Sequence, residues 1–371
     1  MPRLWHNFFA IFSMQKSVLF KWVLVLLLLF LTFSLLIYAK IILLPLTLAG
    51  LLAVLFTPVC NWMEKKGVSR ALASLFCVIL FILFLAIVIY FFIWQIGDIT
   101  RDITAIERNV SEKLHELQLF LYRAFGITPD NQKKLLEGKN ADGFSNIVTS
   151  FMGSFIFIVT NFIIMLVYIF MLLYSRRHLK IFILKLVPET QKEKTEHIIT
   201  QSSKATQHYL LGFALLVMLL WTMYSISFSI IGVKNAFFFA GLCGLLEVIP
   251  FIGSLTGITL TVLMVISQGG DGGMILTVLI VYVIIQSTQF YIIQPLLLGG
   301  EVDINPLVAI FVLITGEIVW GLGGMILAIP LTGIAKIIFD NVEELHPYGY
   351  LLGKHSERRE SILIKIKKWF H

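Results

Sequence analysis

The sequence predicts an all-α polytopic membrane protein with about eight transmembrane segments. Three observations lead to this fold class: 58% of the 371 residues are hydrophobic, only 14% are charged, and the apolar residues form long runs. A soluble domain has roughly 25% charged residues, so lipid must surround most of this chain. A helix needs about 20 apolar residues to cross a bilayer. Runs of about that length or longer occur at about 22–39, 41–63, 71–96, 144–175, 207–233, 235–267, 273–300 and 304–339.

The distribution of basic residues predicts the orientation of these segments. Lysine and arginine concentrate in the N-terminal stretch, in the loops 61–70 and 176–204, and in the C-terminal tail. If every run crosses once, all four lie on one side, which the positive-inside rule identifies as the cytoplasm. We therefore expect a multi-pass protein of the cell inner membrane with both termini in the cytoplasm. The net charge of +7 fits basic cytoplasmic loops and gives no reason to expect nucleic acid as a partner.

This orientation divides the chain into four parts. Residues 1–96 carry the first three segments, and 97–143 form an extracytoplasmic amphipathic segment. Residues 144–340 form the transmembrane core, segments four to eight, with the cytoplasmic loop 176–207. Residues 341–371 form a basic cytoplasmic tail ending in RRESILIKIKKWF. The mixture of isoleucine and lysine in the tail predicts an element that lies on anionic membrane lipid, although the same alternation would fit a strand.

The extracytoplasmic segment has the pattern of one long amphipathic helix. Its apolar residues recur at helical spacing: Ile99, Ile103, Ile106, Val110, Leu114, Leu117 and Leu121. Residues so spaced form one stripe along a helix of roughly seven turns, and such a stripe must be buried. Two interpretations stay open: the stripe packs on the protein's own loops, or it contacts another subunit as in a coiled coil.

The stretch LLEVIPFIGSLTGI in the sixth run combines a carboxylate with helix-breaking residues. A charge in mid-span is costly and normally faces the bundle interior or a wet cavity. Pro250 removes a backbone donor and Gly253 lets the chain bend, and lipid tolerates freed backbone groups only where protein or water satisfies them. Glu247, Pro250 and Gly253 therefore predict a wet site for a cation or a polar solute. The alternative is a structural kink in which Glu247 pairs with Lys234 or Lys336.

A similar pattern occurs in the eighth run. GLGGMILAIPLTGIAK repeats I-P-x-x-G around Pro330, and Glu317 precedes it as an acid precedes the first break. Interrupted spans at corresponding places in two halves of a chain point to a transporter's binding site. We therefore expect the runs 235–267 and 304–339 to be broken or re-entrant, and we include Glu317 and Pro330 in the candidate pathway.

The seventh run contributes three amides to an apolar helix, Gln286, Gln289 and Gln294. Gln286 and Gln289 are three residues apart and hence share a helix face. Amides in lipid-embedded helices often bond to neighbouring helices. The alternative is that they line the pathway and bind a polar solute without charge selection. Asn305, just beyond this run, completes the candidate set.

Enzyme signatures are missing from the sequence. Neither HExxH nor a Walker A motif occurs, and Asp271 in GGDGG has no obvious second acid. The three cysteines lie in apolar segments without a spacing pattern, which argues against a disulfide framework or a metal site. We expect packing as their role, and we expect no catalytic residues, no cofactor and no bound metal.

Four stretches resemble the autoinducer-2 exporter family, also called the PerM-like permeases. They are LLPLTLAGLLAVLFTPVCNWMEKKGVSR, HYLLGFALL, GLLEVIPFIGSLTG and QSTQFYIIQPLLLGGEVDINPLVAIFVLITGEIVWGLGGMILAIPLTGIAK. The resemblance implies an eight-span exporter with both termini inside and a homo-oligomer. The family often has glutamate where this chain has Gln289 and histidine where it has Asn305. Both departures remove a titratable group, which leaves Glu247 and Glu317 as the main candidates for ion coupling.

The sequence therefore predicts an inner-membrane transporter that exports a small polar solute or a signalling molecule. Coupling to a gradient of sodium ions or protons is one expectation, since family members are associated with either export or sodium–proton exchange. Two other functions stay open: a sodium–proton antiporter or channel, and a membrane scaffold that transports nothing.

Overall fold

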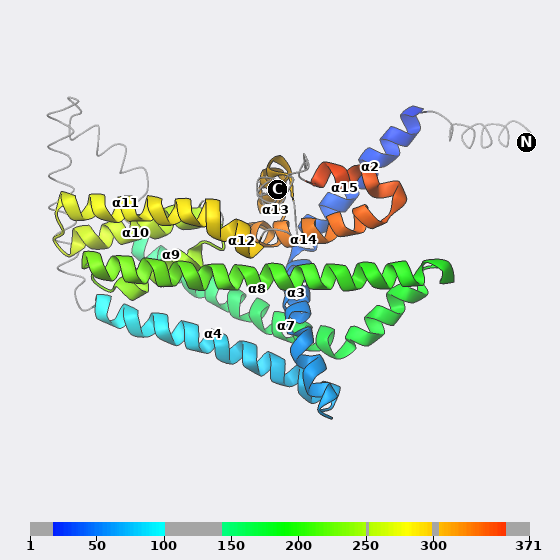
Figure 1. Cartoon of the computed structure of the whole chain (residues 1–371), viewed down its shortest axis with the longest axis horizontal. Coiled ribbons are helices and arrows are strands. Elements are labelled where there is room, and N and C mark those ends of the chain that lie inside the picture. Colours follow the sequence, from blue (N-terminus) through cyan, green and yellow to red (C-terminus); the bar gives the residue numbers. More distant parts are fainter. Residues whose placement is uncertain (1–17, 101–142, 250–251, 299–303, 354–371) are drawn as a thin grey trace, which may run out of the picture.

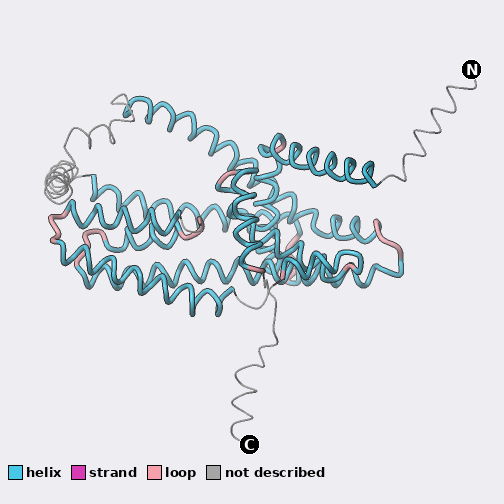
Figure 2. The backbone as a smooth tube through the Cα atoms, turned by 90° about the horizontal axis from the view of Figure 1, so that it is seen from above, coloured by secondary structure: helices cyan, strands magenta, loops and turns pink. Residues whose placement is uncertain are grey.

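The protein is described here from a computed structural model, which describes residues 18–100, 143–249, 252–298 and 304–353. Within these ranges the chain is helical, and Figure 2 shows helices and loops without a strand. One isolated antiparallel bridge pairs Ile304 with Gly353. The all-α fold class is confirmed. The amphipathic stripe beyond Thr100 and the basic tail from residue 354 lie outside the described residues.

Seven helical segments of the described chain are long and apolar enough to cross a membrane. The helices that form them are α2 (Val18–Tyr38), α3 (Lys40–Lys65), α4 (Arg70–Thr100), α7 (Gly143–Lys185), α8 (Lys192–Ile231), α11 (Gly272–Thr288) and α14 (Leu322–Asn341). The π-helical turn η3 (Gln289–Ile293) and α12 (Gln294–Leu298) continue α11. The shorter elements are η2 (Glu189–Gln191), α9 (Ala236–Leu246), α10 (Ile252–Ser267), α13 (Pro306–Trp320), η4 (Glu343–Leu345) and α15 (His346–Leu352).

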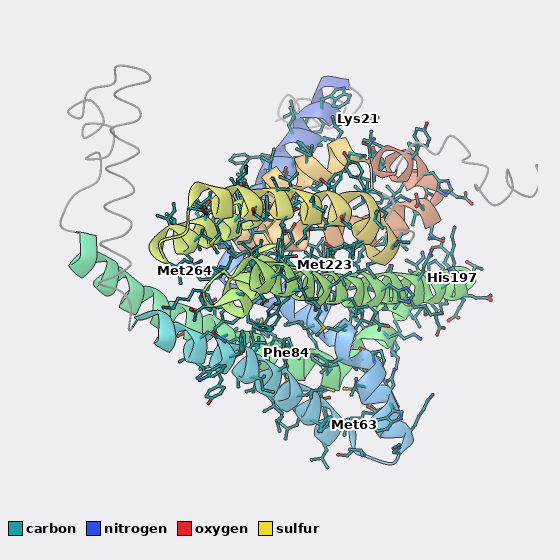
Figure 3. All side chains as sticks on the ribbon, turned by 60° about the vertical axis from the view of Figure 1, so that its left-hand side comes forward. Lys21, Met63, Phe84, His197, Met223 and Met264 are labelled. Carbon is teal, nitrogen blue, oxygen red and sulfur yellow. The ribbon has the colours of Figure 1, made fainter. Side chains whose placement is uncertain are left out.

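Helix α8 is the element around which the others pack. It runs along most of the length of the molecule, with α9, α10 and α11 beside its left-hand half in Figure 1. It contacts α9, α11, α12, α14 and α3. The outer surfaces of the bundle carry large apolar side chains: Phe84 of α4, labelled in Figure 3, is 53% exposed. Such a surface is stable when lipid covers it.

The sixth predicted run is an antiparallel helical hairpin made of α9 and α10. The two legs touch where Cys243 Sγ lies 3.7 Å from Thr261 Oγ1. Their outer ends meet as well, because the Lys234 N–H donates to Gln268 Oε1 at 2.6 Å. Gln268 Nε2 in turn donates to the Gly232 carbonyl at 3.2 Å. The run therefore enters and leaves the bundle at the same end.

The eighth predicted run is a second antiparallel hairpin, in which Gly321 joins α13 to α14. Gly321 has φ +65° and ψ −147°, a conformation that glycine adopts without a steric penalty. The legs approach very closely, since a Cβ on Gly324 would lie 2.0 Å from the Gly316 carbonyl oxygen. Before α13, the Asn305 N–H donates to the Leu352 carbonyl of α15 at 2.8 Å.

In the chain, one helical run lies between the two hairpins. This run, Gly272–Leu298, contains 27 residues, a length of about 40 Å. The expectation that the runs 235–267 and 304–339 are broken or re-entrant is confirmed.

Pro330 does not mark the second break, and this part of the sequence interpretation was wrong. It lies buried inside α14, nine residues beyond the turn at Gly321. A proline in a helix forfeits the hydrogen bond to the carbonyl four residues before it, but packing against neighbours can hold the helix together. A glycine with positive φ instead reverses the chain. The repeated I-P-x-x-G pattern therefore occupies different places in the two hairpins.

Another internal proline shows how the bundle satisfies a freed backbone group. Pro58 lies inside α3 and has no N–H to donate to the carbonyl of Val54. Gln207 of α8 donates its Nε2 to that carbonyl at 2.9 Å. The break in the hydrogen-bond ladder of α3 thereby becomes a contact between α3 and α8.

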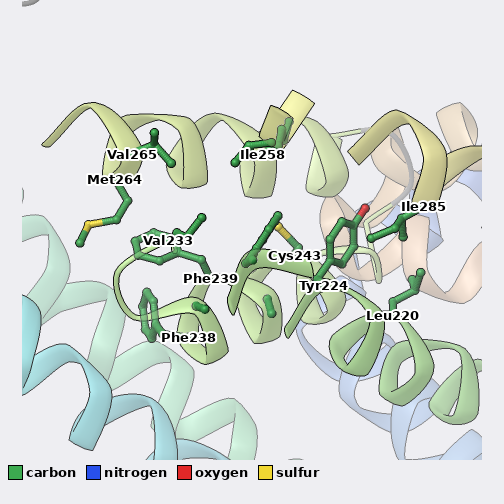
Figure 4. Packing of buried hydrophobic residues seen from close by; sticks show 14 of the residues in the cluster. Leu220, Tyr224, Val233, Phe238, Phe239, Cys243, Ile258, Met264, Val265 and Ile285 are labelled. Atoms are coloured by element: carbon green, nitrogen blue, oxygen red, sulfur yellow. The ribbon is translucent and has the colours of Figure 1, made fainter. Parts of the chain in front are cut away.

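Two apolar cores hold the described helices together. The hairpin core, shown in Figure 4, joins α8, α9, α10 and α11 and includes Tyr224, Phe228, Cys243, Val265 and Val278. The N-terminal core joins α3, α4 and α7 and includes Ala49, Cys60, Cys77, Ile169 and Leu173. Polar contacts close one end of the N-terminal core, where Glu64 of α3 forms ion pairs with Arg176 and Arg177 of α7.

Candidate functional site

The structure places Glu247 at the tip of the first hairpin. α9 ends at Leu246, and Glu247 is the residue that caps it. The chain re-enters a helix through a Gly253 N–H that donates to the Ile249 carbonyl at 2.9 Å. The last carbonyls of a helix carry a partial negative charge, which adds to that of the carboxylate. Pro250 lies outside the described residues.

Two of the predicted amides hold the Glu247 carboxylate from α11 and η3. Gln289 donates from Nε2 to Glu247 Oε1 at 2.8 Å, and Gln286 donates from Nε2 to Glu247 Oε2 at 3.3 Å. Their spacing of three residues puts both side chains on the helix face that meets the hairpin. Each carboxylate oxygen therefore has one amide donor. Of the predicted residues, the structure brings together Glu247, Gln286 and Gln289, with Gly253 at the same turn.

A π-helical turn begins at Gln289. The Gln294 N–H reaches back five residues to the Gln289 carbonyl, and Pro295 follows without an N–H of its own. Single π-turns inside α-helices occur frequently at functional sites. Here the widened turn begins at the residue that binds the carboxylate most closely.

Gln289 also presents an acceptor that no donor uses. Its side chain is only 4% exposed, and its Oε1 has no hydrogen-bond partner among the described residues. The opposite orientation of the amide would set its oxygen against the carboxylate, so the hydrogen-bond network determines which atom faces Glu247. An unsatisfied buried acceptor costs about 1–3 kcal/mol. The site thus offers a carboxylate and a free carbonyl oxygen, which favour a cation or a solute with hydrogen-bond donors over an anion.

Tyr224 of α8 belongs to the site, although nothing in the sequence pointed to it. Its ring is 1% exposed, and Gln286 Nε2 lies 3.4 Å from its hydroxyl oxygen. Figure 4 shows the hydroxyl at the edge of the hairpin core, on the side of Ile285. A tyrosine in an apolar helix is common, so only the fold reveals that this one contacts an amide of the site. A buried tyrosine hydroxyl usually has such a partner.

The remaining predicted residues lie elsewhere. Gln294 is exposed on α12, and Asn305 caps α13 by accepting a hydrogen bond from the Leu307 N–H at 3.0 Å. Glu317 is exposed on α13, a helix that contacts α14, α2 and α3 rather than the first hairpin. Pro330 is buried in α14. The two candidate acids, Glu247 and Glu317, therefore do not form one cluster in the described structure.

The sequence interpretation offered two lysines, Lys234 and Lys336, as alternative partners of Glu247. Lys336 forms an ion pair with Asp340, four residues further along α14, at 2.5 Å. Lys234 lies at the base of the first hairpin, and α9, with its 11 residues, places the tip about 16 Å from that base. Within the described chain, the hydrogen bonds of the Glu247 carboxylate come from the two amides. The described structure therefore does not contain the kink in which Glu247 pairs with one of these lysines.

Long apolar helices, two helical hairpins and a carboxylate held by amides of another helix are together typical of a membrane transporter. Residues 23–344 match the model of a family described as AI-2E family transporter, and the chain belongs to this family. The protein is thus a multi-pass membrane transporter, and a family of transport proteins is consistent with the expectation that it is not an enzyme.

Curated relatives match most of the chain. It is 25% identical over 320 residues to "Putative transport protein YueF" of Bacillus subtilis, which covers 81% of this chain and 84% of that protein. It is 24% identical over 310 residues to "Putative transport protein YrrI" of the same organism, with 81% and 86% covered. "Putative transport protein YhhT" of Escherichia coli K12 is 22% identical over 323 residues, with 84% and 88% covered.

Proposed function

We propose that the protein exports a small polar solute across the inner membrane and that Glu247 binds the coupling cation or the donor groups of the solute. The observation that carries the proposal is the arrangement at the hairpin tip. A carboxylate, the free Gln289 Oε1 and the carboxyl end of α9 converge there, and all are acceptors. Broken helices whose ends face a central site are how many transporters bind ions and substrates.

The hydrogen bonds of Glu247 leave its charge without a cationic partner in the described chain. Amide donors stabilise a carboxylate, but a charge inside a bundle of membrane-spanning helices still favours a partner of opposite charge. This supports coupling to sodium ions or protons. The same acceptors favour the second candidate function, a sodium–proton antiporter, in which the cation itself is the cargo.

Flux measurements test the proposal. We expect purified protein in vesicles to accelerate the movement of autoinducer-2, the solute in the family's name, and imposed sodium or proton gradients to change that rate. Inside-out membrane vesicles should accumulate an exported solute, whereas right-side-out vesicles should not. Sodium–proton exchange without solute movement would establish the antiporter instead. Vesicles that move neither solute nor ions faster than protein-free vesicles would refute transport and favour a scaffold.

We further propose that both termini and the loop 176–207 face the cytoplasm and that 97–143 lies outside. The basic residues support this orientation. In a background without native cysteines, single cysteines at Glu116 and at Lys192 should react with a membrane-impermeant maleimide from opposite sides of the membrane. Labelling of both from the same side would overturn the orientation.

A further inference from the structure

Cys60 and Cys77 are in direct contact, although both are free thiols. Their Sγ atoms are 3.2 Å apart, and each side chain is 0% exposed. Cys60 lies near the end of α3 and Cys77 near the beginning of α4, on either side of the short connection between these helices. The interhelical turn therefore holds two thiols face to face.

The position of the pair is fixed by its surroundings. Cys60 Sγ lies 3.6 Å from the carbonyl oxygen of Ala73, which lies one turn before the other thiol on α4. Ile169 and Leu173 of α7 belong to the same buried core. Close-packed interiors leave side chains little freedom, so the two sulfur atoms stay near each other.

A small movement separates the two sulfur atoms from a bond. A disulfide has an S–S length of about 2.05 Å, so the sulfur atoms must approach by roughly 1.2 Å. A movement of this size lies within small side-chain rotations and a slight shift of one helix. Because Cys60 and Cys77 are both 0% exposed, a protein oxidase cannot reach either sulfur atom. The oxidant must therefore be a small molecule.

We propose that Cys60 and Cys77 are a redox pair that forms a disulfide when a small, membrane-permeant peroxide reaches them. In the first step the sulfur of one cysteine attacks an oxygen of hydrogen peroxide, and the thiol proton passes to the departing hydroxide. An S–O bond forms, the O–O bond breaks, and the products are a sulfenic acid and water. In the second step the other thiol attacks the sulfenic sulfur, the S–S bond forms, and water leaves. The thiols lose two electrons and two protons in total, and the peroxide is reduced to two waters.

The bond would join α3 to α4 next to the ion pairs of Glu64 with Arg176 and Arg177, which join α3 to α7. Oxidation would thus fix the end of the N-terminal core at which three helices meet. This property is independent of the Glu247 site, since the pair lies in the other core.

Cys243 provides an internal control for the experiment. It is also buried, at 2% exposure, but it belongs to the hairpin core, and its polar neighbour is the Thr261 hydroxyl rather than a thiol. Cys243 therefore has no neighbouring thiol in the described structure with which to form a disulfide. If disulfide formation requires two neighbouring thiols, Cys243 should form no disulfide.

The test is thiol mapping of the intact protein in membranes before and after treatment with hydrogen peroxide. After denaturation with an alkylating reagent, we expect three alkylated cysteines before treatment and only Cys243 afterwards, with dithiothreitol restoring the other two. Trypsin cleaves after Lys65, Lys66 and Arg70, so the two cysteines fall in different peptides and a disulfide appears as a linked pair.

Two outcomes would overturn the proposal: three free thiols after peroxide, or sulfinic acid at either cysteine without a linked peptide. The variants Cys60→Ser and Cys77→Ser should form no linked pair. If either variant fails to fold, peptide mapping of the unmodified protein still decides the question.

Discussion

Glu247→Gln is expected to abolish gradient-dependent transport while leaving the protein folded. The substitution keeps the shape of the side chain and removes the charge that the amides of Gln286 and Gln289 now hold. A hydrogen bond to a charged group contributes about 1.5–3 kcal/mol, which corresponds to roughly a ten- to hundredfold loss of affinity. The Gln289 amide can rotate to accept from the new side chain, because its Oε1 is free. Local packing should therefore survive.

The measurement is flux in vesicles as a function of the sodium gradient, the pH and the solute concentration. If the carboxylate binds the coupling cation, the rate should fall and lose its dependence on the gradient. If it accepts hydrogen bonds from the solute, apparent affinity should fall while the ion dependence persists. Glu193→Gln is the matched control, because Glu193 is an exposed acid in the first turn of α8. Normal flux with normal ion dependence in Glu247→Gln would make Glu247 a structural residue.

Gly253→Ala is expected to disrupt the first hairpin. A Cβ at this position would lie 1.6 Å from the Leu246 carbonyl oxygen and 2.4 Å from its carbon, both of which are backbone atoms. Backbone cannot rotate aside as a side chain can, so the tip must open. Overpacking of this kind costs about 1–3 kcal/mol and occasionally more. Because Leu246 precedes Glu247, the displacement also moves the carboxylate away from its amides, and transport should fall even in protein that still folds.

Thermal unfolding in detergent, followed by size-exclusion chromatography, measures the loss of stability. Gly50→Ala is the matched control: Gly50 is a helical glycine of α3, and a Cβ added there would have no atom within 4 Å. That substitution should be neutral or stabilise the protein by about 0.4–1 kcal/mol, since alanine favours a helix more than glycine does. Equal stability of Gly253→Ala and the unsubstituted protein would contradict the close approach at the hairpin tip.

Composition and the lengths of apolar runs were sufficient to predict the helical membrane fold, because a bilayer admits few other solutions. The sequence also predicted one candidate pathway that includes Glu247 and the three glutamines Gln286, Gln289 and Gln294, with contacts to neighbouring helices as the alternative role of the glutamines. The contact of Glu247 with Gln286 and Gln289 followed only from the fold, since nothing in the chain says which face of α11 meets the hairpin. Tyr224 was missed because a tyrosine in an apolar helix carries no signal of its own.

The second hairpin shows why the rest could not be predicted. A proline was the obvious helix breaker in the eighth run, yet the chain reverses at Gly321 and remains helical through Pro330. Whether a proline interrupts a helix depends on neighbours that satisfy the carbonyl it leaves free. The contact of Gln207 with Val54 beside Pro58 is an example, and it joins residues far apart in the sequence.

The first hairpin is joined at its base and contacts α11 and η3 at its tip, and this arrangement has a mechanical consequence. Hydrogen bonds that join Gln268 to Gly232 and Lys234 hold its two legs together at the base. The tip, with Glu247, lies at the other end of the legs. Bending the tip away from α11 would break side-chain bonds to Glu247 while every helix of the bundle keeps its own backbone ladder. Whatever competes for the Glu247 carboxylate therefore weakens two of the contacts that hold the tip against α11 and η3.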